Sequence, residues 1–193
     1  MACKEILTTG LHWWPKRTVL CSFVHAKQNQ NLIFQQIYQS EAGRHAELQM
    51  LKDRDFLSNF KDKNAVDIIL VMNYSPCYFC ADELNYFYKK YRSAYSINSF
   101  NIRFSQLYKT YGSPPKEVKE KNIKGLKDMH LAGIILETMT DEYWFDLFSW
   151  TVFGVNPDHC RNRDNAMKTK LNTLKAVKAE TAKDTASKAK EEK

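Results

Sequence analysis

The amino-acid sequence predicts an α/β fold of three layers, in which helices cover both faces of a sheet of about five strands. Strand-like and helix-like segments alternate along the chain, and the apolar run over residues 65–72 (AVDIILVM) is typical of a strand covered on both faces. A length of 193 residues, 44% of them hydrophobic, is enough for one substantial core. No stretch of about 18 apolar residues occurs, so we expect no membrane association through a spanning segment.

The first half of the chain is expected to form three strands and one helix. Residues 18–25 and 31–39 are predicted as strands around a turn at 27–30, and the buried strand over 65–72 follows later. Between them, residues 44–57 show helical spacing of apolar side chains. Three residues of that helix are expected to face the core: Leu48, Met50 and Leu51.

The second half continues the alternation. A helix is predicted over 77–91 and a strand over 97–108, after which Gly-Ser-Pro-Pro at 112–115 breaks the chain. A charged helix over 116–131 and a short strand over 133–139 complete the sheet.

An aromatic helix is expected after the last strand. Thr140 can cap it, and the two acidic residues that follow suit the first turn of a helix. Its aromatic stripe favours core packing over a binding face: Tyr143, Trp144, Phe145, Phe148, Trp150 and Phe153.

The C-terminal segment holds most of the excess positive charge. Of the formal net charge of +7, residues 161–193 carry ten basic and five acidic groups, which leaves an excess of only two positive charges for the rest. We therefore divide the chain into a domain over 1–160 and a basic C-terminal helix and tail over 161–193. Apolar residues keep helical spacing from Met167 to Val177, whereas residues 181–193 are expected to fray into solvent. A nucleic-acid-binding arm is the alternative for this tail.

The cysteine content points to a reducing compartment. Five cysteines form an odd set without the density of a disulfide scaffold, and the N-terminus lacks the apolar block of a signal peptide. We expect the protein in the cytoplasm or the nucleus.

The candidate catalytic and metal-binding residues lie in two short segments. These are Gly-Arg-His-Ala-Glu at 43–47 and Ser-Pro-Cys-Tyr-Phe-Cys at 75–80. Cys77 and Cys80 share one helix face, and a helix N-terminus stabilises thiolates. With His45 they make three ligands and leave a fourth tetrahedral position for water, as catalytic zinc requires. Glu47 can approach that position as a general base.

A lone Cys-x-x-Cys is also found in structural zinc sites and redox pairs. The upstream His-x-Glu disfavours a redox pair. A structural site needs a fourth ligand, for which Cys160 or His159 could be proposed, although neither has the paired spacing of a zinc finger.

The two segments together resemble the signature of zinc-dependent nucleobase deaminases. The residues around these two segments resemble the AID/APOBEC family. The resemblance extends over residues 18–153 and includes Gln-Leu-Tyr at 106–108, Gly-Leu-Lys-Asp-Met-His-Leu-Ala-Gly at 125–133 and Ser-Trp-Thr-Val-Phe at 149–153. The resemblance implies a cytidine-deaminase-like fold whose last two strands run parallel. It also implies zinc-dependent hydrolytic deamination of cytosine to uracil in single-stranded DNA or RNA.

The resemblance also assigns roles to single residues. His45, Cys77 and Cys80 would hold Zn²⁺, and Glu47 would transfer the proton. The implied substrate contacts are Thr18, Gln39, Tyr74, Ser75, Tyr108 and Lys109. Tyr74 stands where the family usually has tryptophan, and Gln39 replaces a family asparagine. The loop from Lys109 to Tyr111 corresponds to the segment that selects the base 5′ of the target.

Aromatic and basic residues precede the first strand at positions 12–17 (HWWPKR). Lys16 and Arg17 are candidates for phosphate contacts, and stacking plus phosphate contact is what single-strand binding needs. Packing of Trp13 or Trp14 on the core is the alternative for the tryptophans.

Two other functions compete with polynucleotide deamination. A deaminase of free nucleosides or nucleotides would be a compact obligate oligomer with little use for a basic mouth loop. A catalytically weak member that binds nucleic acid would keep the zinc fold, which the intact Glu47 argues against. The choice between DNA and RNA, the 5′ neighbour, the oligomeric state and the pathway are left open.

Overall fold

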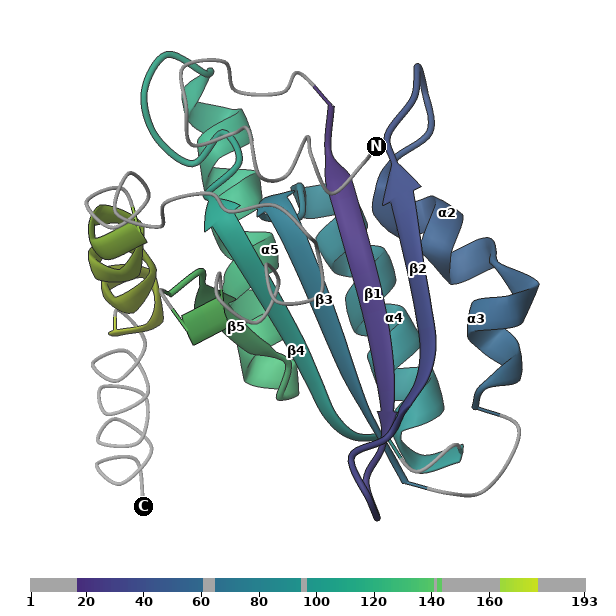
Figure 1. Cartoon of the computed structure of the whole chain (residues 1–193). Helices are drawn as coiled ribbons and strands as arrows, with labels where there is room; N and C mark the ends of the chain where they lie inside the picture. Colours follow the sequence, from purple (N-terminus) through teal and green to yellow (C-terminus); the bar gives the residue numbers. More distant parts are fainter. Residues whose placement is uncertain (1–16, 61–64, 95–96, 141, 144–163, 177–193) are drawn as a thin grey trace, which may run out of the picture.

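The computed structural model describes residues 17–60, 65–94, 97–140, 142–143 and 164–176. Their strands form one mixed sheet in the order β2-β1-β3-β4-β5 (Figure 1). The strands are β1 (Val19–Ala26), β2 (Leu32–Gln39), β3 (Val66–Tyr74), β4 (Ile97–Gln106) and β5 (Ile135–Thr138). β1 runs antiparallel to both its neighbours, whereas β3, β4 and β5 are parallel. The predicted α/β class, with five strands and a parallel final pair, is confirmed.

Two long helices make the crossovers between the parallel strands. α4 (Tyr78–Ala94) connects β3 to β4, and α5 (Lys116–Ala132) connects β4 to β5. Both crossovers advance in the same direction along the sheet, so both helices lie on one face (Figure 1). The predicted aromatic helix begins after Thr140 and extends to Phe153, and of it only Glu142 and Tyr143 belong to the described residues. The Tyr143 N–H donates to the Thr140 hydroxyl at 3.3 Å, as expected of the cap.

The single helix predicted over 44–57 is wrong, because the chain forms two short helices there. α2 (Ala46–Lys52) ends at Asp53, whose backbone is extended, and α3 (Arg54–Ser58) begins after it. The Asp53 carboxylate accepts from the N–H groups of Asp55 and Phe56, so it caps α3 and makes the break stable. Met50 is fully buried, whereas Leu48 and Leu51 are only partly so.

Aromatic side chains fix the short helices against the sheet. Phe56 of α3 contacts Phe60 and Phe87 of α4, with ring centroids 4.9 Å and 5.9 Å away, and Phe87 contacts Phe100 of β4 at 6.1 Å. Such edge-to-face and tilted pairs stabilise beyond the area they bury. This cluster therefore holds α3, which directly follows α2, and α4 on one scaffold.

α4 and α5 approach closely at Gly125. A Cβ built there would lie 3.0 Å from the Ala81 Cβ and 3.2 Å from the Tyr78 Cα. Only glycine leaves room for this approach without displacing a neighbour. α5 is consequently packed against the first turn of α4, directly beside Cys77.

The C-terminal segment joins the domain through a helix over 164–176, drawn in yellow-green beside β5 in Figure 1. Met167 and Leu171 belong to the core, and the Lys175 ammonium donates to the Leu136 carbonyl at 2.6 Å. The predicted apolar stripe thus packs inward up to Leu174, while Val177 and the predicted frayed tail lie outside the described residues.

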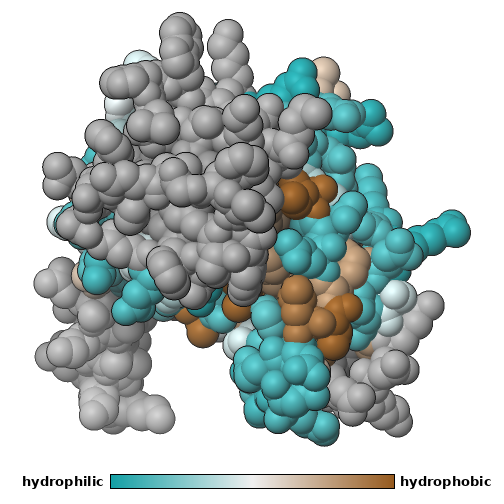
Figure 2. All heavy atoms as spheres, viewed as in Figure 1, coloured by the Kyte–Doolittle hydropathy of each residue, from teal (hydrophilic) through white to brown (hydrophobic). Residues whose placement is uncertain are grey.

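The described surface in Figure 2 is mostly hydrophilic, with apolar side chains gathered in small areas. None of the helices in the described part of the chain combines the length and the apolar composition needed to cross a bilayer.

Candidate active site

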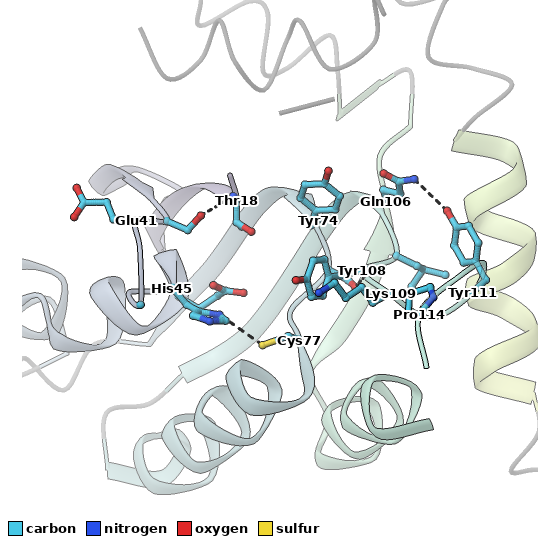
Figure 3. A pocket seen from close by; sticks show the side chains of 15 residues that line it. Thr18, Glu41, His45, Tyr74, Cys77, Gln106, Tyr108, Lys109, Tyr111 and Pro114 are labelled. Carbon is cyan, nitrogen blue, oxygen red and sulfur yellow. Dashed lines mark hydrogen bonds between the residues drawn. The ribbon is translucent and has the colours of Figure 1, made fainter. Parts of the chain in front are cut away.

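A pocket of about 580 Å³ opens at the carboxyl ends of β3 and β4 (Figure 3). Crevices at this edge of an open α/β sheet are the usual ligand sites of such folds. The volume lies within the roughly 300–1,000 Å³ of small-molecule sites. The lining residues are Thr18, Ser40, Glu41, Gly43, His45, Glu47, Tyr74, Ser75, Cys77, Gln106, Leu107, Tyr108, Lys109, Tyr111 and Pro114.

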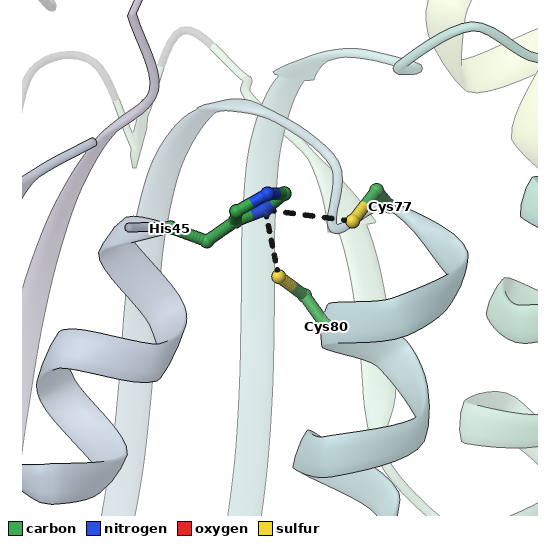
Figure 4. Close-up of side chains that lie close together, drawn as sticks. All are labelled: His45, Cys77 and Cys80. Atoms are coloured by element: carbon green, nitrogen blue, oxygen red, sulfur yellow. Dashed lines mark hydrogen bonds between the residues drawn. The ribbon is translucent and has the colours of Figure 1, made fainter. Parts of the chain in front are cut away.

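Three candidate metal ligands converge at one side of the pocket (Figure 4). The His45 Nδ1 lies 3.6 Å from the Cys77 sulfur and 3.2 Å from the Cys80 sulfur, and all three atoms lie within 4.8 Å of one another. For tetrahedral zinc with its usual bond lengths, a nitrogen and a sulfur ligand stand about 3.6 Å apart. The residues therefore fit a zinc ion, and the described part of the chain adds no fourth His, Cys, Asp or Glu to this cluster.

A tight turn places His45 and Glu47. Gly43 has a φ of +73°, which favours glycine, and Glu41 and Arg44 exchange backbone hydrogen bonds across the turn. His45 is the N-cap of α2, and Glu47 lies in the first turn of that helix. The short helix thus directs both side chains toward the pocket.

Cys77 precedes α4 instead of opening it, since the helix begins at Tyr78 and not at the predicted residue 77. The backbone N–H groups of Phe79 and Cys80 donate to the Cys77 thiol. A hydrogen bond from the Cys80 thiol, assisted by these N–H groups, lowers the pKa of Cys77 to about 6. The same bond and burial raise the pKa of Cys80. A divalent cation would replace the proton that the pair shares, because metal-bound cysteines are thiolates.

Glu47 is the buried carboxyl group of the site. Its side chain is 3% exposed, and burial raises the pKa of Glu47 to about 7, with the charge of Cys77 acting in the same direction. The Oε2 atom has no hydrogen-bond partner among the described residues. A carboxyl group of this kind suits reversible proton transfer near neutral pH.

Two tyrosines form the opposite wall. The rings of Tyr74 and Tyr108 meet edge to face, with centroids 5.8 Å apart, and the Lys109 ammonium lies 5.0 Å from the Tyr108 centroid. Figure 3 shows His45 and Cys77 on one side of the pocket and this wall on the other. The arrangement offers an aromatic surface opposite the candidate metal.

Beyond the wall, Tyr111 connects the rim to the C-terminal helix. Its hydroxyl accepts from the Gln106 amide at 3.2 Å and donates to the Met167 sulfur at 3.7 Å. The Lys170 ammonium lies 3.7 Å from the ring centroid of Tyr111. This contact could not be anticipated, because nothing in the spacing of the sequence relates residue 111 to the helix over 164–176.

The pocket gathers most of the residues singled out from the sequence. Thr18, His45, Glu47, Tyr74, Ser75, Cys77, Tyr108 and Lys109 line it, and Cys80 lies buried behind them. The substrate-contact role expected of Ser75 competes with a structural one, since its hydroxyl accepts from the Tyr108 N–H at 2.9 Å.

Gln39 and Arg17 are not brought to the pocket. Gln39 is the last residue of β2, and its successor Ser40 lines the pocket instead, with its hydroxyl accepting from the Thr18 N–H at 2.8 Å. The Arg17 side chain is exposed and does not line the pocket. Lys16, the fourth-ligand candidates His159 and Cys160, and most of the basic loop lie outside the described residues.

Two buried asparagines were not predicted from the sequence. Asn73 accepts from the Val19 N–H and donates to the Arg17 carbonyl, both at 2.9 Å, and so fixes the start of β1 beside the pocket. Asn122 of α5 is 1% exposed and bonds to both sides of the pocket. A polar residue inside a charged helix gives no sign of such a role in a single sequence.

Comparison with known proteins identifies a family. A family model described as invertebrate AID/APOBEC deaminase matches residues 2–185. No curated protein matches the sequence significantly.

Proposed function

Because the chain belongs to the invertebrate AID/APOBEC deaminase family, we propose that it catalyses zinc-dependent hydrolytic deamination of cytosine to uracil in single-stranded DNA or RNA. The convergence of His45, Cys77 and Cys80 beside the buried Glu47 carboxyl, in one open pocket, is the observation that carries the proposal.

Zinc held by these three residues would supply an activated water nucleophile, because coordination lowers the pKa of water toward 7. Glu47 supplies the proton transfers. Its carboxylate takes up a proton from the attacking water and delivers it to N3 of the cytosine ring as the water oxygen bonds to C4. It then moves the remaining proton of that oxygen to the amino group, so that the C4–N bond breaks, ammonia leaves and the C4 carbonyl of uracil forms. Burial raises the pKa of this carboxyl to about 7, so that it can take up and release protons near neutral pH.

The aromatic wall orients the base. A target base must leave its stack to reach the metal, and it then needs a flat apolar surface on which to lie. The faces of Tyr74 and Tyr108 offer such a surface, and Lys109 places a positive charge at the same rim for a phosphate. These features favour a nucleotide within a strand over a free nucleoside.

The two candidate cysteine ligands bear on the cellular compartment of the protein. The Cys77 and Cys80 thiols must stay reduced to hold a metal, which supports the cytoplasm or the nucleus as the compartment.

The decisive experiment exposes the purified protein to pools of random-sequence single-stranded DNA and RNA, followed by sequencing. We expect cytosine-to-uracil changes in one or both pools, absent from matched double-stranded pools. The bases flanking the changed cytosines report the neighbour preference in the same data.

Free cytidine and deoxycytidine are tested in parallel by release of ammonia. Turnover of the free nucleosides with no change in either pool would replace the proposal by nucleoside deamination. No turnover of any substrate by zinc-loaded protein would favour a binding function.

A further inference from the structure

Asn122 connects the two sides of the pocket from a third element, α5. Its side-chain oxygen accepts from the Tyr78 N–H at 2.8 Å, and its side-chain nitrogen donates to the carbonyls of Tyr108 at 3.2 Å and Lys109 at 3.3 Å. One amide therefore holds the residue after a metal ligand and two consecutive residues of the aromatic wall.

On the metal side, Asn122 completes the N-terminus of α4. The first N–H groups of a helix have no partner within the helix. The Tyr78 N–H is the first of α4, and it donates to the Asn122 side chain. A side chain at the N-cap position, here Cys77, reaches only the second or third N–H of a helix, so the first N–H takes its partner from another element.

On the wall side, Asn122 bonds to a segment whose backbone conformation is intrinsically unfavourable. Lys109 has a φ of +47°, in the left-handed region that a lysine rarely adopts. The Tyr108 N–H donates to the Ser75 hydroxyl, while the carbonyls of Tyr108 and Lys109 accept from Asn122. The unusual conformation is thus fixed by hydrogen bonds on both sides.

We propose that Asn122 is a positioning residue that sets the place of the Tyr108–Lys109 wall relative to the metal ligand Cys77. The inference rests on the proposed function, because it concerns how that pocket presents its substrate. Asn122 itself does not line the pocket, so it acts through Tyr108 and Lys109 and not by contact with the base.

The chemistry of the amide allows its two halves to be separated. In Asn122→Asp the side chain keeps an acceptor for the Tyr78 N–H but loses the donor for the two carbonyls. Removal of the Ser75 hydroxyl, in Ser75→Ala, releases the Tyr108 N–H and leaves the Tyr78 bond intact. Asn29→Asp is the matched control, because Asn29 also uses its side-chain oxygen as an acceptor, for the Asn31 N–H, in the turn between β1 and β2.

The test measures amide hydrogen exchange by mass spectrometry on zinc-loaded protein. In Asn122→Asp we expect peptides spanning 107–114 to exchange about tenfold faster, as the loss of two hydrogen bonds implies, with peptides spanning 76–81 unchanged. Ser75→Ala should accelerate the same 107–114 peptides. Asn29→Asp should leave both regions as in the unmodified protein.

Activity provides the second measurement. We expect Asn122→Asp to keep one zinc per chain while kcat/KM for a single-stranded substrate falls about tenfold. The proposal would be overturned if peptides spanning 107–114 exchanged equally fast in the Asn122→Asp variant and in the unmodified protein. It would also be overturned if the variant lost activity only in proportion to the zinc it had lost. If Asn122→Asp does not fold, Asn122→Ala, which introduces no charge and also removes the donor to the two carbonyls, decides by the same exchange criterion at 107–114.

The exchange result stands apart from the proposed function. If the protein deaminated no substrate, the deamination proposal would be refuted. Faster exchange at 107–114 in the Asn122→Asp variant would still support the positioning role.

Discussion

The two sides of the pocket are held in place by different means. The metal side is mostly local, because His45 and Glu47 follow one glycine turn and Cys77 and Cys80 flank the start of one helix, although the first N–H of that helix bonds to Asn122. The aromatic side depends on distant residues: Ser75, Asn122 and Met167 all bond to the loop between β4 and α5. The reactive groups are therefore set by short segments, whereas the surface that meets the substrate is set by the tertiary structure.

The largest effect is expected on the metal side, from Cys80→Ser. This side chain is fully buried and lies 3.2 Å from the His45 ring nitrogen, so its loss opens the ligand set and leaves two ligands. Bound zinc should fall from one per chain to near zero, with activity lost and the melting temperature lowered. Metal analysis measures the zinc content, and thermal unfolding measures the melting temperature.

Cys21→Ser is the control for Cys80→Ser, since Cys21 is a second buried cysteine, on β1 and outside the ligand cluster. It should keep its zinc. Stoichiometric zinc in the Cys80→Ser protein would remove Cys80 from the ligand set.

The next effect separates chemistry from metal binding within the same side. Glu47→Ala should reduce the deamination rate by about 10²–10⁴-fold, the usual contribution of a general acid–base group, while zinc stays bound. Glu83→Ala, which removes an exposed carboxylate from α4 outside the pocket, should change the rate little. Retained deamination by Glu47→Ala would refute the proton-transfer role.

A smaller effect is expected on the aromatic side. Tyr108→Ala should lower kcat/KM by about 5- to 150-fold, because stacking of one base contributes about 1–3 kcal/mol. Zinc content should not change, which would separate the two sides directly. Tyr86→Ala on the outer face of α4 is the control, as its ring is 64% exposed and away from the pocket. An equal loss in both variants would contradict a specific wall.

The smallest effect concerns the approach of the strand. Lys16→Glu/Arg17→Glu should weaken affinity for single-stranded substrate and reduce the salt dependence by about one unit of slope per charge removed. Turnover of free cytidine, if present, should be unaffected. Lys27→Glu/Lys52→Glu gives the same change of charge at residues that do not line the pocket. Unchanged affinity in Lys16→Glu/Arg17→Glu would remove the basic loop from the binding surface.

The same division explains what the sequence could predict. The strands and the candidate metal cluster depend on local patterns, the apolar run before Tyr74 and the two motif segments. The structure confirms the five-stranded sheet and the convergence of the candidate ligands. Helical spacing over 44–57 gave no sign of the break, because Asp53 acts through a cap that periodicity does not report.

The aromatic side was only partly predictable. Tyr74, Tyr108 and Lys109 were identified by resemblance, but the residues that hold them were not. Asn122 looks like a surface residue of a charged helix, and its burial follows only from the close approach of α5 to α4 at Gly125. Gln39, the last residue of its strand, does not line the pocket, whereas the next residue, Ser40, does.

The loop between β4 and α5 has an evolutionary consequence. Its ends are anchored at Gln106 and Lys116, and the metal ligands belong to other segments. Under the proposed function, substitutions or length changes between Lys109 and Pro115 would alter which strand sequences are accepted and leave the metal ligands unchanged. For a lineage that meets new nucleic-acid targets, this loop would then be a place where selection acts without loss of the catalytic groups.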